Sequence, residues 1–239
     1  MSDLLTSVLD TYGGLDRWRA VTSIAARKRF GGVTWPLKQV SGILDDGDVV
    51  VSVQRERTVF HPFTAPGRRA TFTPDLVEVT AADGEVIDKL ADPRASFAGH
   101  TLQTPWTHPQ LAYFAGYAMW TYLTEPYSLT LPGVRTEEIG PWREGGATWR
   151  RLAVTYPPAI ATHSADQVLY VDPDGLIRRR DYTVDVLGGV PGIHYVHDHR
   201  EVSGIVVPRT RTVYGRGAGG EPQREPVIVS IVLDDVVVA

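Results

Sequence analysis

The segment from Thr107 to Thr124 is the feature that most constrains what this chain can fold into. Its sequence, THPQLAYFAGYAMWTYLT, carries no charge from Leu111 to Thr124 and contains five aromatic rings. Thr107 and Gln110 have the spacing of a capping box, and Pro109 lies in the first turn, where its missing N–H costs nothing. A helix that is apolar on all sides is either enclosed by protein or embedded in a membrane. This one is shorter than the roughly 20 apolar residues needed to span a bilayer, so we expect a helix enclosed by a sheet.

The rest of the chain alternates between short strands and turns. A brief amphipathic helix over residues 4–12 ends at Gly13-Gly14, and from Ser23 onward the apolar residues recur with a period of two. Asp83-Gly84 and the Asp172–Gly175 turn have hairpin chemistry. We therefore predict a mainly β (α+β) fold, with about ten to twelve antiparallel strands in one curved sheet. Because no linker or internal repeat interrupts the pattern, residues 1–239 are interpreted as a single domain.

Composition excludes several classes of function. The net charge is −4 and no basic block is present, so nothing indicates a nucleic-acid partner. The absence of cysteine excludes disulfides, thiol catalysis and zinc–thiolate sites. The first residues lack the basic region, apolar core and cleavage site of a signal peptide, and no integral membrane segment is apparent. We expect a cytoplasmic bacterial protein.

Two stretches resemble a known superfamily. YGGLDRWRAVTSI, from Tyr12 to Ile24, and YVDPDGLIRRRDY, from Tyr170 to Tyr182, are similar to segments of the outer-membrane lipoprotein-sorting (LolA-like) superfamily. The resemblance implies an open, strongly curved antiparallel half-barrel, with helices covering its concave side. Relatives that carry lipids have a signal peptide or a lipid anchor, and this sequence shows neither. A violacein-pathway enzyme is similar in fold and works without a cofactor, so the fold does not decide between carrier and enzyme.

The segment from His194 to His199 is the sharpest polar constellation. On a strand, Tyr195, His197 and His199 point the same way. If this strand pairs with residues 176–186, Asp181 lies close to them. We take His197, His199 and Asp181 as candidate catalytic groups, a base with its orienting partners. Two alternatives remain: a metal site completed by His163 or Asp181, and a solvated strand face.

Two other motifs have ordinary explanations. In the run Arg178–Asp181, alternation points at least one arginine inward, where it would suit a carboxylate or enolate on a ligand. The favoured interpretation is a solvated outer face paired with acidic neighbours. GRGAGG, at residues 215–220, matches a dinucleotide-binding pattern, but the prolines that follow it cannot begin the required helix. We interpret it as a flexible hairpin loop.

The central helix carries the predicted ligand-binding residues. Tyr113, Tyr117 and Trp120 fall at i, i+4 and i+7 and therefore share one face. They are either core or the wall of a cavity, and because each buried hydroxyl needs a partner, we favour a cavity. Glu125 follows the helix as a candidate cavity lip. The predicted ligand-binding set is Tyr113, Tyr117, Trp120, Glu125, Tyr195 and His163.

Two functions fit this reading. The first is a cofactor-independent biosynthetic enzyme of the cyclase, isomerase, lyase or hydrolase type, acting on a hydrophobic or aromatic small molecule by acid–base chemistry. The second is a non-catalytic carrier of a lipid or other hydrophobic ligand. Neither requires a cofactor or a metal. Exposed edges of an open sheet make a homodimer possible, and a purely structural role is the third and weakest alternative.

Overall fold

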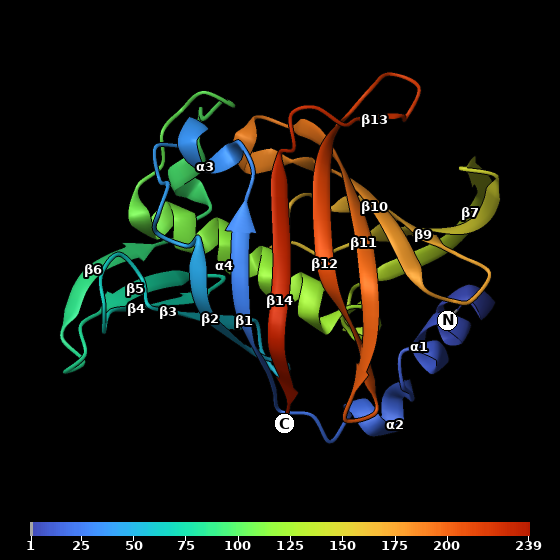
Figure 1. Cartoon of the computed structure of the whole chain (residues 1–239), viewed down its shortest axis with the longest axis horizontal. Coiled ribbons are helices and arrows are strands. Elements are labelled where there is room, and N and C mark those ends of the chain that lie inside the picture. The colour runs from blue at the N-terminus through green and yellow to red at the C-terminus, as the bar shows by residue number, and fades with distance from the viewer. Residues whose placement is uncertain (1) are drawn as a thin grey trace.

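The protein is described by a computed structural model covering residues 2–239, in which one antiparallel sheet of 14 strands curves around a central helix (Figure 1). The strand order is β6-β5-β4-β3-β2-β1-β14-β12-β11-β10-β9-β8-β7, with β13 paired to β12. The predicted fold class, an open half-barrel of antiparallel strands, is confirmed. The sheet has 14 strands where the sequence predicted ten to twelve.

The chain builds the sheet in two halves. The first half consists of β1 (Ser23–Gly31), β2 (Asp46–Ser52), β3 (Arg57–His61), β4 (Arg69–Thr73), β5 (Leu76–Thr80) and β6 (Val86–Ala91). The second consists of β7 (Arg135–Glu144), β8 (Ala147–Thr155), β9 (Asp166–Val171), β10 (Ile177–Val184), β11 (Val190–Val202), β12 (Ile205–Arg216), β13 (Pro222–Gln223) and β14 (Val229–Val238). Most neighbours are consecutive in sequence, as in a meander, and β1 joins the halves by pairing with β14.

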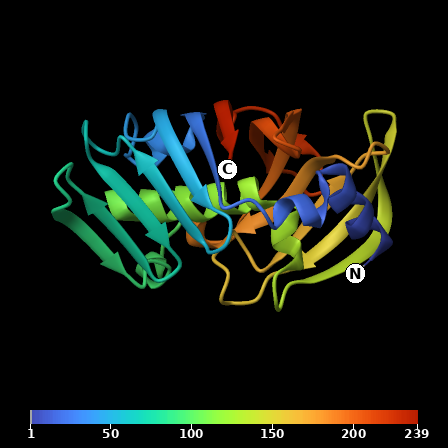
Figure 2. The same ribbon diagram turned by 90° about the horizontal axis from the view of Figure 1, so that it is seen from below.

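Helix α4 (His108–Thr124) connects the halves and lies along the concave side of the sheet (Figure 2). Its N-terminus has the predicted capping box: Thr107 Oγ1 accepts from Gln110 N at 3.3 Å, and Gln110 Oε1 accepts from Thr107 N at 3.0 Å. Every residue from Pro109 to Thr124 is buried. The prediction of an enclosed helix is therefore confirmed, with its start within one residue of the expected position.

Small residues let α4 approach the first half of the sheet closely. Thr58 Oγ1 on β3 donates to the Gly116 carbonyl at 2.9 Å. A Cβ added at Gly116 would lie 2.3 Å from Cγ of Phe72 on β4, so only glycine fits at this crossing.

The remaining helices are short. The N-terminal helices are α1 (Asp3–Thr11) and α2 (Gly14–Trp18), and α3 (Thr34–Leu37) follows β1. Single 3₁₀ turns are η1 (Ala95–Phe97), η2 (Tyr127–Thr130) and η3 (Asp185–Leu187). Helix α1 begins at the Ser2 cap and packs against β8, burying the apolar residues Leu4, Leu5, Val8 and Leu9. Within residues 2–239, no helix has both the length and the apolar character that crossing a membrane requires.

The sequence pattern of residues 37–44 also predicts a strand, and this prediction is wrong. The chain turns there instead, passing through α3 and a loop before β2 begins at Asp46. The reason is a long-range contact: the buried Lys38 Nζ donates to the carbonyls of residues 101, 102 and 104 at 2.7 to 3.0 Å. Helix α3 also buries Trp35, whose ring contacts Phe30 on β1 and Phe114 on α4.

Candidate functional site

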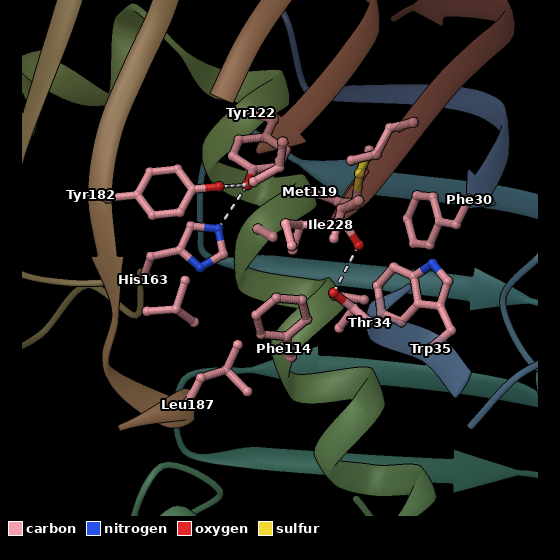
Figure 3. Close-up of a pocket in the computed structure, with 16 residues that line it drawn as sticks. Phe30, Thr34, Trp35, Phe114, Met119, Tyr122, His163, Tyr182, Leu187 and Ile228 are labelled. Atoms are coloured by element: carbon pink, nitrogen blue, oxygen red, sulfur yellow. Dashed lines mark hydrogen bonds between the residues drawn. The ribbon is translucent and has the colours of Figure 1, made fainter. Parts of the chain in front are cut away.

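An apolar cavity of about 40 Å³ lies between α4 and the sheet (Figure 3). Phe30 and Trp35 lie at one end of it, and Tyr122, His163 and Tyr182 lie at the other (Figure 3). The remaining lining residues are mostly aliphatic: Thr34, Phe114, Ala115, Ala118, Met119, Val184, Leu187, Val213, Ile228, Val229 and Ile231. Thr34 Oγ1 donates to the Ile228 carbonyl at 2.9 Å, so even this hydroxyl is satisfied within the wall.

His163 is the centre of the polar end of the cavity. Its Nε2 lies 2.7 Å from the Tyr122 hydroxyl and its Nδ1 lies 3.2 Å from the Tyr117 hydroxyl. The Tyr122 hydroxyl is in turn 3.4 Å from that of Tyr182, whose ring stacks on His163 with centroids 4.3 Å apart. These contacts fasten the 157–165 loop to both α4 and β10.

The imidazole of His163 is neutral. Burial lowers its pKa well below 6.5, and the positive charges of Arg180 and Arg94 lower it further. A neutral imidazole donates through one nitrogen and accepts through the other, so one tyrosine hydroxyl donates to His163 and the other accepts. Burial also raises the pKa of Tyr117 and of Tyr122, so the network holds no charge.

Charged side chains are buried directly behind Tyr122. Arg180 on β10 points inward and pairs with Glu125, which follows the last turn of α4. Arg211 on β12 is 1% exposed, and its Nη2 donates to the Tyr122 carbonyl at 2.7 Å. The guanidinium carbons of Arg180 and Arg211 lie 5.7 and 4.8 Å from the centroid of the Tyr122 ring. Around this ring, two guanidinium groups thus face one carboxylate.

His194 on β11 completes this buried cluster. Its ring centroid lies 4.5 Å from that of Tyr122, and it is fully buried. Neither of its ring nitrogens has a hydrogen-bond partner among residues 2–239. Burial lowers the pKa of His194 well below 6.5, with Arg211 and Arg180 adding to the effect, so this imidazole is neutral as well.

The predicted helix face divides into three different environments. Trp120 Nε1 donates to the carbonyls of Ser52 and Arg55 at 3.0 and 3.1 Å, so this indole closes the end of β2. Tyr117 bonds to His163 as described above. Tyr113 packs against Phe72 and lies on an open groove instead of the central cavity.

Asp181 and Tyr195 lie on the convex side of the sheet. Because Arg180 points toward α4, alternation turns its neighbours Arg179 and Asp181 the other way. Arg179 Nε and Nη2 donate to the Asp181 carboxylate at 2.7 and 2.8 Å, and Arg179 Nη1 donates to Glu144 at 2.6 Å. Tyr195 also donates to Glu144. The favoured solvated-face interpretation was wrong for Arg179 and Arg180, since both are fully buried.

Arg179 also fixes the glycine-rich loop. Its Nη2 donates to the Gly220 carbonyl at 2.7 Å, and its guanidinium lies 4.6 Å from the Tyr170 ring centroid and 5.2 Å from that of Trp142. The carboxylates of Asp181 and Glu144 are taken up by these partners, so we interpret the convex cluster as a clamp on the loop.

His197 and His199 do not share a face. Strand β11 pairs with β10 as predicted, with Arg179 opposite Tyr195, but Asp198 has a φ of 51° and interrupts the alternation. His197 is exposed and stacks on Tyr195, with centroids 6.2 Å apart. His199 packs edge-on against Tyr12, and its Nε2 lies 3.1 Å from the Ile177 carbonyl. The three candidate catalytic residues, His197, His199 and Asp181, therefore do not converge on the cavity. Within residues 2–239, no group of three or more His, Asp or Glu is placed to hold a metal.

An open groove of about 420 Å³ lies on the other side of the 157–165 loop from the cavity. Its walls include Tyr113, Arg94 and Tyr156, together with residues 157–162 of the loop. Thr162 lines the groove and the next residue, His163, lines the cavity, so the loop borders both spaces.

Sequence reasoning missed Arg211, His194, Tyr156 and Tyr182. Alternation along the strand did place His194 on the other face from Tyr195. Arg211 is separated from the buried Val207 and Val213 by an even number of positions, so the three share a face of β12. This spacing is the signal that indicates an inward-facing arginine. No local pattern indicates the role of Tyr156, because the neighbours of its hydroxyl come from distant segments.

No protein-family model matches the chain, and no curated protein matches its sequence. Among the solved structures similar to this chain, two match over nearly their whole length. A DUF1329 family protein from Desulfovibrio piger has a TM-score of 0.57 at 12% identity, over 99% of this chain and 94% of the other. A LolA superfamily protein from Nitrosomonas europaea has a TM-score of 0.54 at 10% identity, over 98% and 92%. At these identities the likeness concerns the fold alone, and that fold is the LolA-like half-barrel.

Proposed function

We propose that this protein is a non-catalytic carrier, which binds a hydrophobic small molecule between α4 and the concave face of the sheet. The observation that carries the proposal is the central cavity, whose wall is apolar except for groups that satisfy one another. A polar substrate would gain no hydrogen bond from such a wall and would lose those it makes with water. An apolar ligand loses no hydrogen bonds on entering the cavity, and the removal of its apolar surface from water favours binding.

The ligand enlarges the cavity when it binds. The space of about 40 Å³ is smaller than the cavity of about 150 Å³ that accommodates benzene in an engineered protein core. The wall contains Met119, whose unbranched thioether side chain adapts to changes in shape. Ala115 and Ala118 leave α4 thin where it borders the cavity. We therefore expect side-chain movement, with α4 and the sheet as the fixed walls.

The placement of the polar residues favours a carrier over an enzyme. Acid–base catalysis needs a titrating group within hydrogen-bond reach of the substrate. His197 is exposed on the convex side, and His163 is buried, neutral and bonded to two tyrosines. The enzyme hypothesis stays a prediction, because the candidate acid–base residues do not come together at the cavity.

Filling the cavity tests the proposal. Ala118→Leu adds three carbons at the cavity wall, whereas Ala118→Ser keeps the space open and serves as the matched control. We expect wild-type protein to bind the apolar fluorophore N-phenyl-1-naphthylamine and to retain lipid detectable by native mass spectrometry. Ala118→Leu should weaken fluorophore binding about tenfold, which corresponds to about 1.4 kcal/mol, with Ala118→Ser within about twofold of wild type. If wild-type protein binds no fluorophore and carries no lipid, the carrier proposal fails.

A further inference from the structure

Three hydrogen-bond donors without partners meet behind the open groove. Tyr156 Oη, Ser128 Oγ and Arg180 Nη1 are all buried, and none has a hydrogen-bond partner among residues 2–239. They come from three separate segments: the end of β8, the 3₁₀ turn η2 and strand β10. Arg180 and Ser128 lie beside the Tyr156 hydroxyl but outside normal hydrogen-bond geometry. A buried donor without a partner is destabilising, so a ligand that accepts hydrogen bonds would be stabilised where three such donors meet.

The charge of this region also lacks a counterpart. Arg180 and Arg211 are both 1% exposed, and the Glu125 carboxylate is the acidic group paired with them. Burial lowers the pKa values of His163 and His194, so these rings add no positive charge. One positive charge is therefore in excess. Arg211 Nε is a further donor without a partner in the described chain. Buried charges are normally paired, so the cluster is complementary to one negative charge.

Tyr156 lies between the cluster and the open groove. It forms part of the groove wall, beside residues Pro157 to Ala161, which border the same space. The groove is large enough for a small headgroup, and the loop at Thr162 and His163 borders both the groove and the apolar cavity. An elongated molecule can place a polar end at Tyr156 and its apolar body toward α4.

We propose that Tyr156, Ser128 and Arg180 bind the carboxylate of an amphiphilic ligand, that is, a long-chain or aromatic carboxylic acid. This inference rests on the proposed carrier function and adds the chemical class of the headgroup. The two hydroxyls and the guanidinium N–H are donors that a carboxylate accepts from. A carboxylate carries the single negative charge that the cluster lacks, whereas a phosphate monoester at neutral pH carries nearly two. Glu125 stays paired with Arg180 in the complex.

A matched pair of ligands separates headgroup recognition from chain binding. Dodecanoate and dodecan-1-ol have the same chain, and their affinities for the full-length protein can be compared by isothermal titration calorimetry at pH 7.5. We expect wild-type protein to bind dodecanoate at least about tenfold more tightly than dodecan-1-ol, since hydrogen bonds to a charged group are stronger than those to a neutral hydroxyl. Tyr156→Phe should reduce dodecanoate affinity about tenfold and leave dodecan-1-ol within about twofold.

Ser128→Ala supplies an independent variant, with the same expected loss for the acid alone. Both substitutions remove hydroxyls that have no partner within residues 2–239, so thermal melting temperatures should be unchanged or slightly higher. Tyr214→Phe is the control, because it makes the same chemical change beside Tyr195 on the convex face. Equal affinities of acid and alcohol, unaffected by either variant, would overturn the headgroup site and leave the carrier function standing. Failure of both ligands to bind would overturn both proposals.

Discussion

At the scale of single residues, the interior of this protein is unusual for the charge that it buries under an apolar helix. Arg180, Arg211 and Glu125 are each less than 8% exposed, at 1%, 1% and 7%. Buried ion pairs contribute little net stability compared with apolar residues of the same volume, because desolvation offsets their attraction. Breaking one of them is costly, since the remaining charge stays buried without a partner. A cluster of this kind is more easily explained by what it binds than by what it stabilises.

The Glu125–Arg180 pair gives a prediction at this scale. Glu125→Gln removes the carboxylate and leaves both guanidinium groups without a negative charge, so the free energy of unfolding should fall by about 3 to 5 kcal/mol. Urea denaturation followed by tryptophan fluorescence measures the change. The double variant Glu125→Gln/Arg180→Met should recover most of the loss, because it removes the stranded charge. A single variant as stable as wild type would show that the pair is solvated.

At the scale of secondary-structure elements, α4 packs most closely against the first half of the sheet. It is buried on all sides, and its contacts with the first half rest on the absence of a side chain at Gly116. Phe72 on β4 occupies the place that a Cβ would need. Glycine at this position therefore lets the helix lie closer to the sheet than any other residue would allow.

Gly116→Ala tests this close approach. The added Cβ would meet Phe72 Cγ, Cβ and Cδ1 at 2.3, 2.4 and 2.8 Å, which forces the helix or the ring to move. Overpacking of this kind costs about 1 to 3 kcal/mol, against a gain of up to about 1 kcal/mol in helix propensity. We expect a net loss of stability in urea denaturation.

Gly140→Ala is a matched control for the Gly116 variant. The nearest atom to its added Cβ is the end of the Arg151 side chain at 3.9 Å, so its stability should stay close to wild type. Phe72→Leu, combined with Gly116→Ala, should recover part of the loss by making room. If Gly116→Ala were more stable than wild type, the helix would not be held at this depth by packing.

At the scale of the whole molecule, proton binding by buried groups determines how the free energy of unfolding depends on pH. The pKa values of His163 and His194 lie well below 6.5, and that of His199 is lowered to about 4, with burial the largest cause in each case. Below about pH 6.5 the unfolded chain binds protons that the folded chain does not, so stability falls as the pH decreases. Burial raises the pKa of Glu56 from 4.5 to about 8, and this shift has the opposite effect: it makes stability fall as the pH rises.

These two contributions predict maximum stability near pH 6.5. Between about pH 4.5 and 8 the folded state keeps a proton on Glu56 that the unfolded state has released, so stability falls as the pH rises through this range. Above pH 6.5 the opposing contribution of the histidines diminishes, while Lys28 and Lys38, whose pKa values burial lowers to about 8, begin to oppose the Glu56 effect, so the decline stays below about 1.4 kcal/mol per pH unit. Glu56→Gln, measured by urea denaturation at pH 6.5, 7.25 and 8, should abolish the decline. Glu85→Gln, on the exposed β5–β6 turn, controls for loss of a surface charge.

The course of the backbone was largely predictable from the sequence. The capping box and the uncharged run at Thr107–Thr124 define α4 because both signals lie within one stretch of chain. Turn residues such as Asp83-Gly84 and Asp172–Gly175 mark hairpins for the same reason. The exception at residues 37–44 shows the limit: Lys38 finds its partners more than 60 residues away, and their attraction overrides the local strand pattern.

Alternation along a strand separates side chains into two sets, but the sequence by itself does not determine which set faces the helix. Arg180 faces the helix, where it pairs with Glu125 at the end of α4. Arg179 lies on the convex face and is nevertheless buried, because three aromatic rings and two carboxylates enclose it. The left-handed Asp198 separates His197 from His199, which periodicity would have kept together. The sequence determined the elements, since their signals are local. Tertiary structure decided the site, because the cost of burying a charge depends on partners that only folding brings near.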